Sequence, residues 1–149
     1  MSERHYLRPA AIDRVFNALV AGLTRLGISL YGARVLAVPG RKSGVVRTVP
    51  VNLLEHGGGR YLVAPRGETE WVLNLRASGR GELRLGKRSE AFVAHEVVAD
   101  ADKVPVLRAY IAAWWFEVKR FFELPGPDAT DEQIARVAGQ HPVFRIDSV

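Results

Sequence analysis

Apolar residues recur along this chain with two different spacings, and the spacing separates helical segments from strands. Apolar side chains fall at helical intervals in residues 9–26, in the stretch after Thr69, in residues 103–122 and in residues 131–138. Short β-branched runs bounded by turn residues predict strands at residues 33–38, 46–54, 60–65, 82–87, 90–98 and 141–146. Tight turns between successive runs indicate antiparallel pairing. The pattern predicts one α+β domain over residues 1–149, with about six strands, an N-terminal helix and C-terminal helices.

The turn between the first two predicted strands has an unusual composition. It reads Gly40-Arg41-Lys42-Ser43-Gly44, and a third cation, Arg47, follows at the start of the next strand. Glycine lets backbone N–H groups approach a ligand closely, and Arg and Lys supply charge-assisted donors for phosphate or carboxylate. The turn is therefore a candidate anion site, with a solvated basic turn as the alternative interpretation.

Antiparallel topology is expected to bring a fourth cation toward this turn. Because strands of a meander alternate in direction, Arg66 returns after the third strand to the end of the sheet that holds Arg41 and Lys42. Arg47 ends an otherwise apolar strand face and should emerge at the rim of the core. Pro50 cannot donate to a strand ladder, so it predicts an edge or a bulge against which a ligand can lie. Such a cluster of cations repels itself unless an anion binds among them.

The short helix after Thr69 places an amide beside apolar side chains. Trp71, Asn74 and Leu75 fall at i, i+3 and i+4, on one helix face. Trp and Leu indicate that this face is buried, so the Asn74 amide needs a partner. That partner is either a neighbouring backbone group or a bound ligand.

Composition limits the chemistry that the chain can perform. A hydrophobic content of 48% and a charged content of 25% are typical of a globular domain, and the net charge of +5 favours an anionic partner. The absence of cysteine excludes disulfides and thiolate nucleophiles, and the four scattered histidines do not predict a metal site. No serine-nucleophile elbow, carboxylate pair or Rossmann glycine fingerprint is present. We therefore expect a protein that binds a cofactor and leaves the chemistry to it.

Partners and location follow from the same pattern. Aromatic residues are not interleaved with the basic ones on the strands, so nucleic-acid binding is not expected. Because the sequence shows no signal-peptide pattern and no apolar run of ~20 residues, we expect a cytoplasmic protein. Weak peripheral membrane contact through residues 9–26 is the alternative.

The sequence resembles the deazaflavin-dependent nitroreductase family, whose members bind coenzyme F420 on a split β-barrel. The resemblance rests on the turn Gly40-Arg41-Lys42-Ser43-Gly44 with Arg47 and Pro50, on Val63-Ala64-Pro65-Arg66-Gly67, and on Trp71 with Asn74-Leu75. It implies a mainly antiparallel split barrel. It also implies that the cofactor's phosphate and acidic glutamyl tail are held by Arg41, Lys42, Ser43 and Arg47. The remaining cofactor-binding residues, along the deazaflavin and its side chain, would be Pro50, Ala64, Pro65, Arg66, Trp71 and Asn74.

The implied reaction is hydride transfer from reduced F420 to a small hydrophobic acceptor such as a quinone, nitroaromatic or enone. Orientation and electrostatics would supply most of the catalysis. Tyr110 is the only tyrosine near the aromatic helix, and no proton donor is assigned. The alternatives are a non-enzymatic carrier of F420 or of a fatty acid, and an FMN-dependent reductase. A homodimer is compatible with this kind of barrel.

Overall fold

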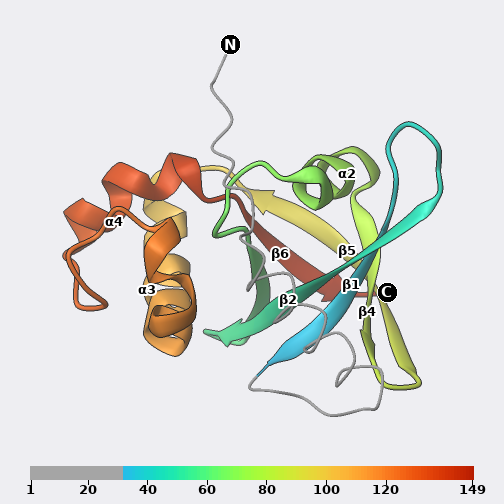
Figure 1. Cartoon of the computed structure of the whole chain (residues 1–149), viewed down its shortest axis with the longest axis horizontal. Helices are drawn as coiled ribbons and strands as arrows, with labels where there is room; N and C mark the ends of the chain where they lie inside the picture. The colour runs from blue at the N-terminus through green and yellow to red at the C-terminus, as the bar shows by residue number, and fades with distance from the viewer. Residues whose placement is uncertain (1–31) are drawn as a thin grey trace.

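Six antiparallel strands form a closed barrel in the computed structural model, which describes residues 32–149 (Figure 1). The strands are β1 (Ala33–Pro39), β2 (Val46–His56), β3 (Gly59–Val63), β4 (Arg80–Leu85), β5 (Arg88–Val97) and β6 (Val143–Ser148). Their order around the barrel is β1-β2-β3-β6-β5-β4, and β4 pairs with β1 to close it. The predicted meander and the predicted six-stranded antiparallel sheet are therefore confirmed. The helix predicted at residues 9–26 lies outside the described residues.

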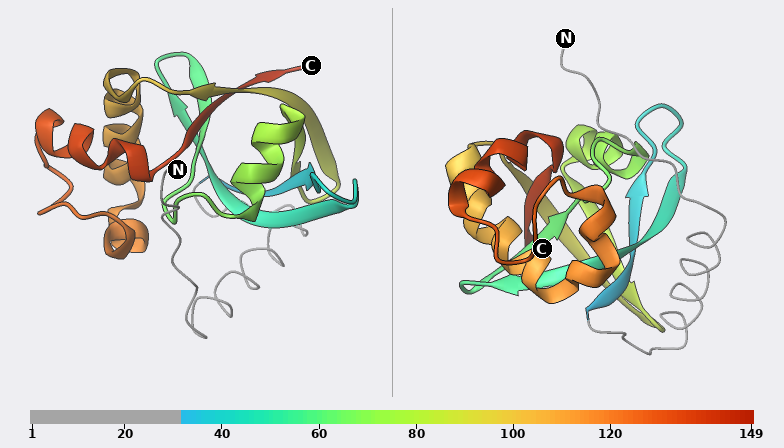
Figure 2. Two further views of the ribbon diagram at one scale, coloured as in Figure 1. Left: turned by 90° about the horizontal axis from the view of Figure 1, so that it is seen from above. Right: turned by 60° about the vertical axis from the view of Figure 1, so that its left-hand side comes forward.

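The helices of the described region occupy two different places on the barrel. They are α2 (Glu70–Ser78), α3 (Asp100–Val118) with the 3₁₀ turn η1 (Lys119–Phe121), and α4 (Asp131–Val137) with η2 (Ala138–Gln140). Figure 2 shows α3 and α4 together on one side of the barrel and α2 apart from them. The helix predicted at residues 103–122 ends earlier than expected, because Trp114 departs from helical geometry and the chain passes into η1. Within the described residues, no helix is both long and apolar enough to span a membrane.

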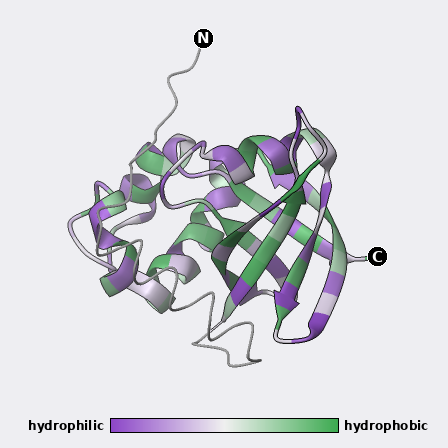
Figure 3. Cartoon of the chain, turned by 45° about the vertical axis from the view of Figure 1, so that its right-hand side comes forward, coloured by the Kyte–Doolittle hydropathy of each residue, from purple (hydrophilic) through white to green (hydrophobic). Residues whose placement is uncertain are grey.

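Hydrophobic and hydrophilic residues alternate along the strands (Figure 3), so apolar side chains point to both sides of the sheet at different positions and form two hydrophobic cores. The barrel interior contains Leu36, Val38, Leu62, Ala64, Leu83, Phe92, Phe144 and Ile146, and α2 adds Val72 and Leu75. A second core packs α3 and α4 against Leu54, Val63 and Val143 on the outside of the barrel. Because Val72 and Leu75 reach the interior residues, α2 covers the end of the barrel near the β1–β2 turn.

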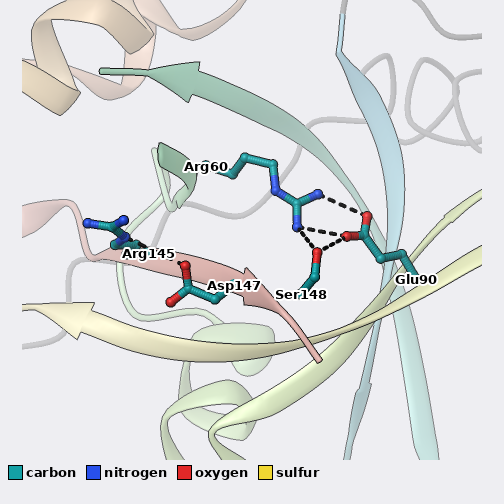
Figure 4. A network of polar contacts seen from close by, with 5 residues as sticks. All are labelled: Arg60, Glu90, Arg145, Asp147 and Ser148. Carbon is teal, nitrogen blue, oxygen red and sulfur yellow. Dashed lines mark hydrogen bonds and ion pairs between the residues drawn. The ribbon is translucent and has the colours of Figure 1, made fainter. Parts of the chain in front are cut away.

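A polar network closes the opposite end of the barrel (Figure 4). Arg60, Glu90 and Ser148 continue the inward rows of Leu62, Phe92 and Ile146. The Arg60 guanidinium donates to both Glu90 oxygens at 2.9 and 2.7 Å, and Ser148 Oγ donates to Glu90 Oε1 at 2.6 Å. These hydrogen bonds, first from Arg60 and then from Ser148, lower the pKa of Glu90 to about 2.

Strand β2 is longer than its neighbour β3, so within residues 32–149 part of β2 has no strand partner on the β3 side. Strand β1 pairs with Val46–Asn52, whereas β3 pairs with Leu53–His56 alone. Among the described strands, the first seven residues of β2 therefore have β1 as their single partner. Pro50 lies in this stretch. The predicted edge position of Pro50 is confirmed.

Candidate anion-binding site

The β1–β2 turn is held in shape by its own backbone. The Gly40 N–H donates to the Val45 carbonyl at 2.9 Å, and the Gly44 N–H donates to the Gly40 carbonyl at 2.8 Å. Ser43 Oγ accepts from the Val45 N–H at 3.2 Å. Gly44 adopts φ +74°, a conformation that costs a side-chain-bearing residue free energy. These hydrogen bonds fix the shape of the turn, and Lys42 and Ser43 are exposed.

Helix α2 is tied to this turn through one buried amide. Asn74 is 4% exposed, and its Oδ1 accepts from the Arg41 backbone N–H at 3.1 Å and from Arg41 Nη1 at 2.8 Å. Arg41 Nη1 also donates to Glu70 Oε2 at 2.8 Å. The Asn74 oxygen thus finds its partner in the neighbouring turn. Asn74 positions the turn in this structure, and a direct contact between Asn74 and a cofactor stays a prediction.

A pocket of about 400 Å³ lies between the turn and α2. Its lining residues are Gly40, Arg41, Lys42, Ser43, Arg47, Glu70 and Asn74. Lys42 and Arg47 are exposed, and within residues 32–149 neither has a hydrogen-bond or ion-pair partner. Arg41 is already bound to α2, so Lys42 and Arg47 are the two cations ready to meet a ligand. This donor set suits a phosphate or a carboxylate.

Glu70 is a pocket residue that the sequence analysis did not single out. It is the first residue of α2, where an acidic side chain is commonly explained by the helix dipole alone. A signal was nevertheless present in the sequence. Glu70 precedes Asn74 by four residues, so the two side chains share one helix face and reach the same turn.

The expected cluster of four cations is a cluster of three in this pocket. Arg66 is not among the lining residues, and its guanidinium carbon lies 6.0 Å from the Phe121 ring centroid. The physical reason is that β3 pairs with only the last residues of β2 and ends at Val63. The chain then leaves the sheet before it reaches the level of the turn. A role for Arg66 along a bound cofactor stays a prediction.

The Ala64–Pro65 segment is anchored to the start of β6. The Ala64 N–H donates to the Pro142 carbonyl at 2.9 Å, and His141 Nδ1 lies 2.9 Å from the Pro65 carbonyl. Because a carbonyl oxygen only accepts, Nδ1 carries the hydrogen. The His141 ring also stacks on Phe122, with centroids 3.9 Å apart. The buried His141 therefore supports a predicted cofactor-binding segment.

Trp71 and Tyr110 each pack against one of the two hydrophobic cores. Trp71 packs against the barrel interior, 6.1 Å from Phe144 between ring centroids, and it does not line the pocket. Tyr110 of α3 is 2% exposed, and burial raises the pKa of its phenol, which stays neutral at physiological pH. Neither observation assigns a catalytic role.

Fold and site together define an antiparallel barrel with a pocket lined by cations at one end, an arrangement that suits the class of split-barrel cofactor-binding proteins. Residues 14–119 match the sequence profile of the F420H(2)-dependent quinone reductase family, and the chain belongs to this family. The predicted kinship with deazaflavin-dependent reductases is thereby confirmed, and F420 is the family's cofactor. No protein with a curated description matches the sequence.

Solved structures with low sequence identity share the fold. An F420-H2 dependent reductase, FDR-A, is 18% identical, with 78% of this chain and 94% of that chain covered and a TM-score of 0.53. A protein described as a domain-swapped dimer is 17% identical over 91% of this chain and 96% of that chain, with a TM-score of 0.54. A putative pyridoxamine 5'-phosphate oxidase from Listeria innocua is 12% identical over 91% of each chain, with a TM-score of 0.52. These likenesses establish the split-barrel fold.

Proposed function

We propose that this protein is an oxidoreductase that uses reduced F420 to reduce an electron-poor small molecule, such as a quinone, a nitroaromatic or an enone. Family membership supports an F420-dependent reductase. The observation that carries the proposal is the pocket beside the β1–β2 turn, in which Lys42 and Arg47 lack partners among the described residues. A pocket with two uncompensated cations fits a cofactor that carries a phosphate and an acidic tail.

The residues present fit F420 by the chemistry of their donors. Lys42 and Arg47 would hold the phosphate and the glutamyl carboxylates, and the Ser43 hydroxyl hydrogen is available to donate because its oxygen is the atom used within the turn. Arg41 would act from its position against α2. Pro50, on the singly paired stretch of β2, and the Ala64–Pro65 segment would lie along the ring system.

When bound and reduced, F420 supplies a hydride to the acceptor. The protein itself would bind the cofactor and the acceptor, orient them and shield them from solvent. Helix α3 leads into η1, whose Phe121 lies beside Arg66 and gives this side of the molecule an aromatic ring. We propose that a flat hydrophobic acceptor lies against this aromatic side. The neutral phenol of Tyr110 is buried beneath it and is not assigned as a proton donor.

A fluorescence titration with oxidised F420, with FMN in parallel, tests the cofactor assignment. The double variant K42A/R47A removes two charge-assisted contacts, which should cost at least ~3 kcal/mol, or about a hundredfold in affinity for F420. The matched control is K87A/R88A, which removes the same charge from the exposed β4–β5 turn.

Four outcomes would count against the proposed function. Unchanged F420 affinity in K42A/R47A would remove the pocket from the cofactor site. An equal loss in K87A/R88A would mean that net charge alone attracts the cofactor. Tight binding of FMN with weak binding of F420 would favour the FMN-dependent alternative. Bound F420 without turnover of any quinone, nitroaromatic or enone would favour a carrier.

We also propose a homodimer. The support is the structural neighbour described as a domain-swapped dimer. Light scattering coupled to gel filtration measures the mass directly, and a monomeric mass across the concentration range would reject the proposal.

A further inference from the structure

Glu70 is a carboxylate in a pocket whose other charged side chains are cations. Its Oε2 lies 2.8 Å from Arg41 Nη1, and its side chain is 74% exposed on the pocket side of α2. The pocket therefore holds three positive charges and one negative charge among its lining residues. A site built only to attract anions has no need of the carboxylate.

Of the three cations that line the pocket, one is bound to the Glu70 carboxylate and two are not. The Arg41 guanidinium is shared between Glu70 Oε2 and Asn74 Oδ1, and its side chain is 25% exposed. Lys42 and Arg47 are outside this arrangement and are exposed. A ligand that enters the pocket meets two uncompensated cations and must compete with Glu70 for the third.

A fixed negative charge beside a ligand site opposes anions in proportion to their charge. At a separation of roughly 7 Å in a water-like dielectric, the repulsion weakens binding by about threefold for each ligand charge. The penalty is therefore modest for a singly charged group and becomes large for a multiply charged one. Added salt reduces it, because both partners are solvent-exposed.

We propose that Glu70 sets the charge selectivity of the pocket: it holds Arg41 against α2 and disfavours ligands of high negative charge. The identity of the natural ligand rests on the proposed function, in which the ligand is the tail of F420. The charge effect of Glu70 does not depend on that identity. It follows from the placement of one carboxylate in the pocket and can be measured with simple anions.

The variant E70Q isolates the charge. Glutamine has nearly the same shape, and its amide oxygen can still accept from Arg41, so the turn keeps its attachment to α2. The matched control is E68Q, which changes the net charge equally. Glu68 pairs with Arg76 at 2.9 Å and does not line the pocket, and Arg76 keeps its second partner Glu96 at 2.7 Å.

The test is calorimetric titration of the full chain with inorganic phosphate, pyrophosphate and tripolyphosphate at low salt. Relative to wild type, we expect E70Q to bind phosphate about threefold more tightly and tripolyphosphate at least about tenfold more tightly. The gain should shrink in high salt, and E68Q should stay within about twofold of wild type. E70A should show at least the same gain, since it removes the same charge and also the acceptor that competes for Arg41.

The proposal is overturned if E70Q binds these anions no more tightly than wild type, if E68Q gains as much as E70Q, or if none of the three anions binds either protein. A parallel titration with F420 separates the two proposals. If the affinity gain of E70Q does not increase with ligand charge while F420 still binds, the role of Glu70 alone is rejected. If that gain increases with ligand charge but F420 does not bind, the cofactor assignment alone is rejected.

Discussion

The Arg60–Glu90–Ser148 network predicts a specific dependence of stability on pH. The perturbation is E90Q, which removes the carboxylate charge while keeping the side-chain shape. Glu90 accepts two hydrogen bonds from Arg60 and one from Ser148, and its pKa falls from 4.5 to about 2. That lowering is equivalent to about 3 kcal/mol of preference for the charged form in the folded state. Because the Glu90 side chain is 44% exposed, solvent screening reduces our expectation to ~1.5 kcal/mol.

The sign of the effect is set by the direction of the pKa change. The folded-state pKa of Glu90 lies below its unfolded value, so its stabilisation is fully present above about pH 4.5 and is lost as the pH falls toward 2. We expect E90Q to lower the free energy of unfolding by ~1.5 kcal/mol at pH 7 and by less than half of that at about pH 3.

Urea unfolding followed by circular dichroism at the two pH values measures this difference. The control is E82Q, because the Glu82 side chain is similarly exposed and contacts its arginine, Arg84, only at 3.4 Å, with one hydrogen bond from Ser89 Oγ at 2.9 Å. E82Q should change the free energy of unfolding by less than about 0.5 kcal/mol. The same E90Q deficit at both pH values, or none at pH 7, would refute the reasoning.

Two further substitutions test the turn and the barrel. N74L removes the acceptor of two Arg41 hydrogen bonds and leaves a backbone N–H without its partner, so it should lower the free energy of unfolding by ~2 kcal/mol and weaken F420 binding. The N74D variant keeps the acceptor and should retain most of the stability and of the F420 affinity. Chemical denaturation measures the stability, and the fluorescence titration measures the affinity. G81A places a Cβ 2.9 Å from Phe92 inside the barrel and should lower the free energy of unfolding by ~1–3 kcal/mol, as measured by thermal unfolding. G139A, with open space around the new Cβ, should lower it by less than about 1 kcal/mol. Equal losses of stability in the two variants would contradict the packing argument.

Local sequence chemistry determined most of the secondary structure. The strand at residues 33–38 is observed as Ala33–Pro39, and the helix expected after Thr69 begins at Glu70 with Thr69 as its N-cap. The cation-bearing turn between β1 and β2 was likewise readable, since glycine and adjacent strand patterns act over a few residues. Proline also acts locally, and Pro50 lies where β2 has one strand partner among the described residues.

Contacts between distant segments were decided by the tertiary structure alone. The sequence placed Arg66 with Arg41 by strand direction, but direction does not specify how far two strands stay paired. In the structure, β3 leaves the sheet early and Arg66 lies by Phe121. The Asn74 amide was known to need a partner, and only the packing of α2 against the turn selected Arg41.

The same distinction separates the two charged sites of the barrel. Lys42 and Arg47 were candidate ligand-binding residues from the sequence because one lies in the β1–β2 turn and the other at the start of β2, where neighbours along the chain are neighbours in space. Arg60 and Glu90 lie thirty residues apart and meet because β6 pairs with both of their strands. Sequence patterns encode periodicity and turns, which are short-range. Pairing between strands that are distant along the chain joins residues whose separation no local pattern records, so these contacts follow only from the folded chain.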